Sequence, residues 1–168
     1  MWWSDRRSLL RAAAALPLLA ACGFTPLYAP GAPATRMAGR VEVGIVQGGP
    51  GFLLREELTG RLGPPTAPTH RLDIDLRLER TGVALTQQDV TTRYNVVGTA
   101  SYTLVPLAGG APAASGVVRA ITGYSAPEAK AASAFAVQAA EDDAERRLAI
   151  DLADSILQRL ALSAEGWT

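Results

Sequence analysis

The chain has 168 residues, and its 16 basic and 16 acidic side chains give a formal net charge of zero at pH 7. This balance leaves no basic excess for binding nucleic-acid phosphates and no block of like charge typical of a disordered tail. The length suits one domain preceded by a short targeting segment. Cys22 is the only cysteine, so an intramolecular disulfide is excluded.

Residues 1–21 have the pattern of a secretory signal peptide. Three arginines lie within the first 11 residues, and residues 12–21 then run AAAALPLLAA without a charge. This apolar run is shorter than the roughly 20 residues that a membrane-spanning helix needs, and Pro17 disfavours a buried helix. The adjacent Arg6 and Arg7 leave both the general and the twin-arginine export routes open.

Cys22 ends the signal segment in a specific context. The sequence Leu19-Ala20-Ala21-Cys22 resembles the lipobox of bacterial lipoproteins, which implies cleavage before Cys22 and acylation of its thiol and amine. Two or more acyl chains anchor a protein stably, whereas one chain holds it only marginally. The residue after Cys22 is Gly23 and not an aspartate. In this respect the chain resembles lipoproteins that are passed on to the outer membrane.

Residues 22–40 are rich in Pro, Gly and Ala, and we expect a lipidated N-terminus followed by an extended tether. Residues 41–45 alternate between apolar and other side chains and predict a first strand. A turn is expected at residues 48–51. Leucines then recur every four residues up to the Gly63-Pro64-Pro65 break, which predicts a short amphipathic helix; these are Leu54, Leu58 and Leu62.

Three further strands are predicted in succession. From Arg71 to Glu79, apolar residues alternate strictly with charged ones, so one face is apolar and the other is charged. A second alternating run extends from Tyr94 to Leu104. A loop at residues 106–115 joins it to a strand over residues 117–124.

Ser133 has the position of an N-cap for a long helix that reaches about Leu162. Its apolar stripe consists of Leu148, Leu152, Ile156 and Leu160. The element order is therefore β-α-β-β-β-α. We expect an α+β fold in which two helices pack on one face of a four-stranded, mainly antiparallel sheet, forming a single domain over residues 41–168.

No set of residues predicts catalysis, a cofactor or a metal site. His70 is the only histidine, and we interpret it as a solvated residue at the start of a strand. Asp73 and Asp75 share one strand face but interleave with arginines, which favours a solvated, salt-bridged surface. Residues 141–143 are consecutive acids that point in different directions on a helix, so they are interpreted as helix surface. We therefore do not expect an enzyme.

Basic side chains remain as candidates for non-enzymatic binding. Arg71, Arg77 and Arg93 are expected on the polar sheet face, and Lys130 is the only lysine. Guanidinium and ammonium groups pair with the phosphates of anionic glycolipids. The alternative interpretation is that each of these residues is an ordinary charged residue of the surface without a ligand.

Several motifs resemble one family in order and spacing. Cys22-Gly23-Phe24-Thr25-Pro26-Leu27-Tyr28 is similar to the start of mature lipopolysaccharide-assembly lipoproteins of the LptE family. Further similarities occur at Thr92-Arg93-Tyr94, at Ala100-Ser101-Tyr102-Thr103-Leu104, at Gly123-Tyr124-Ser125, at Ser133-Ala134-Phe135-Ala136 and over residues 140–146. Together they cover nearly all of the chain after Cys22.

The resemblance implies a fold of two helices on a four-stranded sheet. It also implies a plug inside the large outer-membrane β-barrel LptD, with lipopolysaccharide as a ligand and the outer membrane as the site of the lipid anchor. Basic residues at one end of such domains contact the lipid. One such position, near the start of the final helix, corresponds to Lys130, and another lies in the loop before the Arg93 strand, where Arg93 itself is the neighbouring basic candidate. The loop that precedes the Arg93 strand has Thr86-Gln87-Gln88-Asp89, without a basic residue. One version of this hypothesis is therefore a plug that supports the barrel structurally and does not bind lipopolysaccharide directly.

A second class of function stays open on the sequence alone. A free, periplasm-facing lipoprotein without a barrel partner would act as an envelope scaffold or bind a small ligand. Copurification from detergent-solubilised outer membrane discriminates between the two classes.

Overall fold

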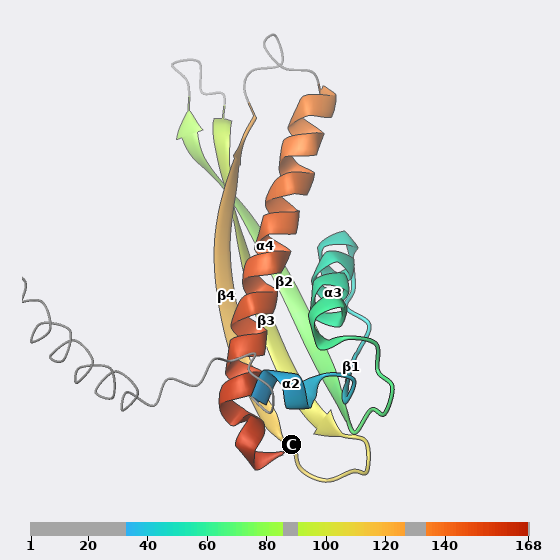
Figure 1. Ribbon diagram of the computed structural model, residues 1–168. Coiled ribbons are helices and arrows are strands. Elements are labelled where there is room, and N and C mark those ends of the chain that lie inside the picture. Colours follow the sequence, from blue (N-terminus) through green and yellow to red (C-terminus); the bar gives the residue numbers. More distant parts are fainter. Residues whose placement is uncertain (1–32, 86–90, 127–133, 168) are drawn as a thin grey trace, which may run out of the picture.

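The structure is a computed structural model that describes residues 33–85, 91–126 and 134–167 (Figure 1). The elements in chain order are helix α2 (Pro33–Met37), strand β1 (Val41–Val43), helix α3 (Gly49–Leu62), strands β2 (His70–Leu85), β3 (Thr91–Pro106) and β4 (Ala114–Ser125), helix α4 (Ala134–Ser163) and the 3-10 helix η1 (Ala164–Gly166). Within the described ranges no helix is long and apolar enough to span a membrane.

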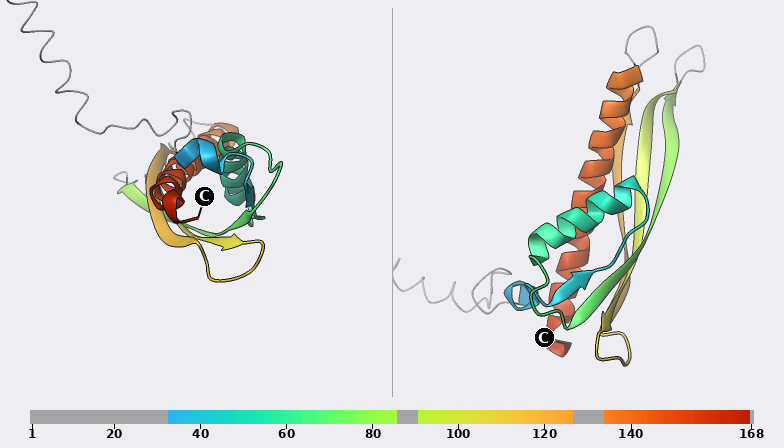
Figure 2. Two further views of the ribbon diagram at one scale, coloured as in Figure 1. Left: turned by 60° about the horizontal axis from the view of Figure 1, so that its bottom comes forward. Right: turned by 90° about the vertical axis from the view of Figure 1, so that its right-hand side faces the viewer.

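The four strands form one sheet in the order β1-β2-β3-β4. β1 is parallel to β2, because α3 carries the chain back between them, whereas the β2–β3 and β3–β4 pairs are antiparallel. Helices α3 and α4 lie on the same side of this sheet (Figure 2), which we call the inner face; the opposite side is the outer face. The expected α+β fold, with its element order and mainly antiparallel sheet, is confirmed.

The core lies between the helices and the inner face. The leucines at intervals of four in α3 and the apolar stripe of α4 are all buried, as predicted. Gly98 of β3 allows α4 to approach closely, since a Cβ atom built there would lie 2.9 Å from Leu148 Cδ2. The buried inner-face residues of β2, β3 and β4 belong to the same hydrophobic cluster as this stripe; they are Leu72, Val96, Ala100, Tyr102, Leu104 and Val118.

The structure begins with a helix where an extended tether was expected. α2 occupies Pro33–Met37, and Met37 is among the largest fully buried side chains. Met37 belongs to the main hydrophobic cluster, and burying its apolar side chain favours an ordered turn over an extended chain. The ordered part of the domain therefore starts before residue 41.

Two boundaries differ from the sequence-based expectation. β1 ends at Val43 rather than Ile45, because Val46 turns inward to pack on Gly51 and leaves Ile45 exposed. α3 begins at Gly49, within the expected turn. Gly48 supplies the turn with a φ of 83°, and Pro50 fits the first helical turn because that turn needs no backbone N–H bond. The proposed N-cap Ser133 lies outside the described residues.

Candidate functional site

The charged side chains on the outer face of β2 pair with one another. The Arg71 and Asp73 side chains lie 2.9 Å apart, and Arg77 and Asp75 lie 3.2 Å apart. All four are solvent-accessible, so these pairs contribute little stability but leave no local excess charge. The expected salt-bridged surface at Asp73 and Asp75 is confirmed, and Arg71 and Arg77 already have anionic partners.

Arg93 differs from these arginines. It is exposed near the start of β3, in register with Ser125 of β4, and its side chain has no hydrogen bond or ion pair with any residue that the structure describes. It lines a cleft of about 360 Å³ at the β4 edge, together with Ile121, Gly123, Arg147 and Asp151. A guanidinium without a partner is available to an anion.

Arg147 is a member of this cleft that sequence reasoning missed. Its Nε donates to Asp143 Oδ2 at 3.0 Å, and its Nη2 donates to the Gly123 carbonyl oxygen at 3.2 Å. Because β4 is an edge strand, the Gly123 carbonyl needs a partner from outside the sheet. Arg147 thus protects part of the β4 edge, and the packing of α4 against β4, not sequence proximity, brings it near Arg93.

The other two proposed site residues, Cys22 and Lys130, lie outside the described residues. So does the segment Thr86-Gln87-Gln88-Asp89. Lys130 belongs to the connection between β4, which ends at Ser125, and α4, which begins at Ala134. Since Arg93 is in register with Ser125, it lies at the end of the sheet from which this connection starts.

Arg80 occupies the inner face of β2, where the alternation of Leu72 to Leu78 would place an apolar residue. Its Nη2 lies 2.6 Å from Glu141 Oε1 on α4, and it also bonds Glu145. Burial works to lower the pKa of Arg80, but the hydrogen bond to Glu145 and the charges of both glutamates raise it above its ordinary value. Arg80 therefore connects the sheet to the first half of α4.

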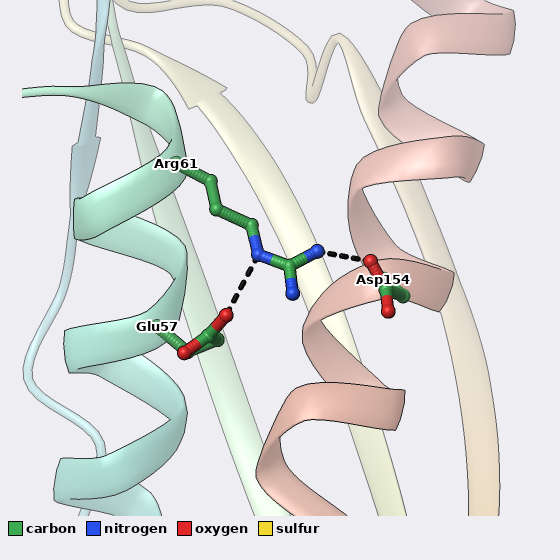
Figure 3. A network of polar contacts seen from close by, with 3 residues as sticks. All are labelled: Glu57, Arg61 and Asp154. Atoms are coloured by element: carbon green, nitrogen blue, oxygen red, sulfur yellow. Dashed lines mark hydrogen bonds and ion pairs between the residues drawn. The ribbon is translucent and has the colours of Figure 1, made fainter.

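A second polar network connects the two long helices. Arg61 of α3 lies between Glu57, one turn earlier at 2.7 Å, and Asp154 of α4 (Figure 3). Desolvation lowers the pKa of Arg61, and the bonds and charges of both carboxylates outweigh this and raise it. These residues keep α3 alongside α4 and form no reactive arrangement, because every member is already paired.

His70 is not solvated, and this prediction is wrong. Only 8% of the residue is exposed, because the Trp167 ring packs edge-on against the imidazole with centroids 5.1 Å apart. Burial lowers the pKa of His70 and favours its neutral form. Nδ1 lies 2.9 Å from Thr69 Oγ1, which satisfies one ring nitrogen. His70 is thus a packed residue at the base of the sheet.

Within the described ranges, no three His, Cys, Asp or Glu side chains gather as metal ligands. Every buried side-chain polar atom there has a hydrogen-bond partner. The arrangement offers arginines for anion binding and a broad sheet face for contacts.

Comparison with protein families gives a match over most of the chain. A family model described as "LptE: Lipopolysaccharide-assembly" matches residues 38–160, from just before β1 to the last turns of α4. A search of curated proteins finds no match.

Solved structures share this fold. A lipoprotein from Caulobacter crescentus is 20% identical with a TM-score of 0.61, covering 79% of this chain and 96% of that one. The rare lipoprotein B from Shewanella oneidensis is 17% identical with a TM-score of 0.54, covering 74% and 95%. A minor lipoprotein from Acinetobacter baumannii is 15% identical with a TM-score of 0.52, covering 73% and 89%. At these identities the structures establish the fold.

Proposed function

Because the chain belongs to the LptE family of lipopolysaccharide-assembly proteins, we propose that it partners an LptD-type outer-membrane β-barrel as a plug and assists lipopolysaccharide transport to the cell surface. The observation that carries this proposal is the family match, which spans almost the whole described domain rather than a single motif. The protein works by binding and not by catalysis.

The proposed location is the periplasmic side of the outer membrane and the barrel lumen, with Cys22 as the lipid anchor. The Leu19-Ala20-Ala21-Cys22 sequence supports this anchor. Mass spectrometry of the mature protein should find acyl groups on Cys22, and Cys22→Ala should leave an unprocessed or soluble precursor. A mature wild-type protein without acyl mass on Cys22 would remove the basis for the location.

The barrel partnership is tested by depletion and copurification. We expect the barrel to copurify with this protein from detergent-solubilised outer membrane, and depletion to leave the barrel misassembled and lipopolysaccharide stalled before the cell surface. Normal barrel assembly and lipid export after depletion would refute the proposal. A protein that never copurifies with a barrel would instead be a free envelope scaffold or small-ligand binder.

Within this function, Arg93 and Lys130 are proposed to hold lipopolysaccharide phosphates. The unpaired state of Arg93 among the described residues supports its part. Arg93→Glu combined with Lys130→Glu should weaken lipopolysaccharide binding, and the loss should depend on salt. Barrel copurification should survive, because interface energy concentrates in buried anchors rather than rim charges.

Arg77→Glu is the matched control for these charge reversals, since Arg77 shares the outer face but is paired with Asp75. Equal losses of lipopolysaccharide binding in the control and the double variant would show that only overall charge matters. Unchanged binding in the double variant would leave a purely structural plug.

A further inference from the structure

A second cleft lies at the opposite end of the sheet from Arg93, where the last turns of α4 pass the start of β4. Its volume is about 370 Å³, and its lining includes Tyr102, Ser115, Arg159 and Leu162. The register places Leu104 opposite Ala114 here, eleven residues along β3 from the Arg93–Ser125 pair. The two clefts are therefore separate sites.

Tyr102 brings a hydroxyl into this region from a buried position. The residue is only 4% exposed and stands on the inner face of β3, opposite Gly116. A Cβ atom added to Gly116 would lie 2.8 Å from the Tyr102 hydroxyl oxygen, so glycine is what leaves room for that hydroxyl beside β4. The hydroxyl has no hydrogen bond to any described residue, and because no buried side-chain polar atom in the described ranges lacks a partner, this oxygen is the accessible tip of an otherwise buried residue.

Arg159 supplies a positive charge to the same cleft. It is exposed on α4 and forms no ion pair with the described part of the chain. Burial raises the pKa of Tyr102, and the nearby charge of Arg159 partly offsets this by lowering it. No described carboxylate lines this cleft, in contrast to the Arg93 cleft with its Asp151.

Apolar surface adjoins these donors. Leu162 is 85% exposed, and Ala113 and Ala114 also line the cleft. An arginine, a free phenol and a serine hydroxyl beside exposed leucine suit an anionic amphiphile: the donors match phosphate oxygens and the leucine matches the start of an acyl chain.

The cleft lies near the point where the chain enters the domain. α2, the first described element, packs against α4 and η1 at the C-terminal end of α4 (Figure 1). Eleven positions separate Cys22 from Pro33, a span of at most about 36–40 Å when fully extended. If Cys22 is acylated, the membrane surface lies within that reach of this end.

We propose that this cleft binds the phosphate of a membrane phospholipid head group, with Arg159 and Tyr102 as donors and Leu162 against the adjoining acyl region. The inference rests on the lipid anchor of the proposed function. It gives the domain a second membrane contact, which would orient the end that carries Arg93 away from the lipid surface.

The binding test uses the full mature chain with Cys22→Ser, which carries no acyl chain and needs no detergent. Its melting temperature is first compared with that of the lipidated protein to show that both have the same stability. The probes are dihexanoyl phosphatidylglycerol, inorganic phosphate and dihexanoylglycerol. Binding is followed by NMR through the arginine Nε–H signals and the indole N–H of Trp167, which donates to Ser163 at the rim of the cleft. Phosphatidylglycerol should bind saturably and more tightly than either other probe.

Arg159→Gln should weaken this binding about tenfold or more, and Tyr102→Phe about threefold, since a charged hydrogen bond contributes more than a neutral one. Arg119→Gln, which removes an exposed arginine of β4 that lines neither cleft, should leave the affinity unchanged. Each variant's melting temperature separates lost binding from lost folding.

Three outcomes would overturn the inference. Equal affinity for inorganic phosphate would indicate a free-anion site, equal affinity for dihexanoylglycerol would indicate unspecific apolar binding, and unchanged affinity in Arg159→Gln would place the lipid elsewhere. In cells, Arg159→Gln should keep barrel copurification. Failure of head-group binding therefore leaves the barrel proposal standing, and failure of wild-type copurification would refute that proposal independently.

Discussion

Arg80 shows how one side chain depends on a distant partner. It lies on the inner face of β2 in register with the fully buried Val96, but its own side chain is 47% exposed, so the burial that matters is that of its two partners. The side chains of Glu141 and Glu145 are only 20% and 13% exposed, so each of these carboxylates also depends on Arg80. The three charges form one unit that spans β2 and α4.

Replacing Arg80 with Gln should lower the free energy of unfolding by about 1–2 kcal/mol, because two half-buried carboxylates lose their cation. Arg77→Gln is the matched control: its ion pair with Asp75 is largely exposed, and its loss should cost no more than about 0.5 kcal/mol. Urea denaturation measures both. Equal effects would show that Arg80 acts only as a surface residue.

His70 should make stability depend on pH. Burial lowers its folded pKa below the unfolded value of about 6.5, so the unfolded chain binds the proton more readily. The free energy of unfolding should therefore be highest above pH 6.5 and decline as the pH falls from there towards the folded pKa. Unfolding in urea at pH 7.5, 6.5 and 5.5 should show the decline, and His70→Gln should remove it. An identical slope in the variant would contradict this assignment.

At the scale of elements, β1 is much shorter than the strand it pairs with. It covers only His70, Arg71 and Leu72 of the 16-residue β2, so the rest of β2 has an open edge. Leu72 is fully buried under this cover, whereas Ile74, Leu76 and Leu78 are only partly buried although they share its face. The strict alternation in sequence does not distinguish these positions.

Substitutions at three positions of β2 test this decrease in burial along the strand. Leu72→Asp should unfold the domain, because the carboxylate would lose its water without gaining a partner. Ile74→Asp should destabilise it less, since its side chain can reach the open edge. Asp75→Ser should change the free energy of unfolding by no more than about 0.5 kcal/mol. Melting temperatures in any other order would disprove the face and edge assignments.

Helix α4 is also buried unevenly along its length. Its nine buried residues all lie from Ala144 onwards, and none of residues 134–143 is buried. Near its start the helix is instead tied to the sheet by the ion pairs of Glu141 and Glu145 with Arg80 of β2. The two halves of α4 thus depend on different forces.

At the scale of the whole molecule, the two ends of the described chain close one end of the sheet. α2 packs against η1, Ala164 is fully buried, and Trp167 covers His70 at the start of β2. The Trp167 indole nitrogen donates to Ser163 Oγ at 3.2 Å. Ala164 therefore belongs to the core, and Trp167 packs against it.

Trp167→Ala should lower the free energy of unfolding by about 1–3 kcal/mol, because His70 and the base of the core become exposed. Trp167→Phe should cost less, since it keeps the ring contact with His70 and loses only the indole hydrogen bond. Thermal melting at pH 7.5 compares the two variants. Wild-type stability in Trp167→Ala would show that the closure of this end is not energetically important.

The sequence by itself determined the element order from β1 to α4, the α+β class and the two apolar helix stripes, because periodicities of two and of about 3.6 residues are local properties of the sequence. It also predicted the paired charges at Asp73 and Asp75, since their partners are two residues away on the same strand. The family motifs, which lie in one fixed order, led to the LptE family that the family match confirms.

Only the tertiary structure decided which polar residues are buried or unpaired. His70 meets Trp167 from the other end of the chain, Arg80 meets glutamates more than 60 residues away, and Tyr102 and Arg159 share a cleft because α4 ends over the start of β4. Such contacts depend on strand register and helix placement, which arise from packing of the whole core and leave no periodic signal in the sequence.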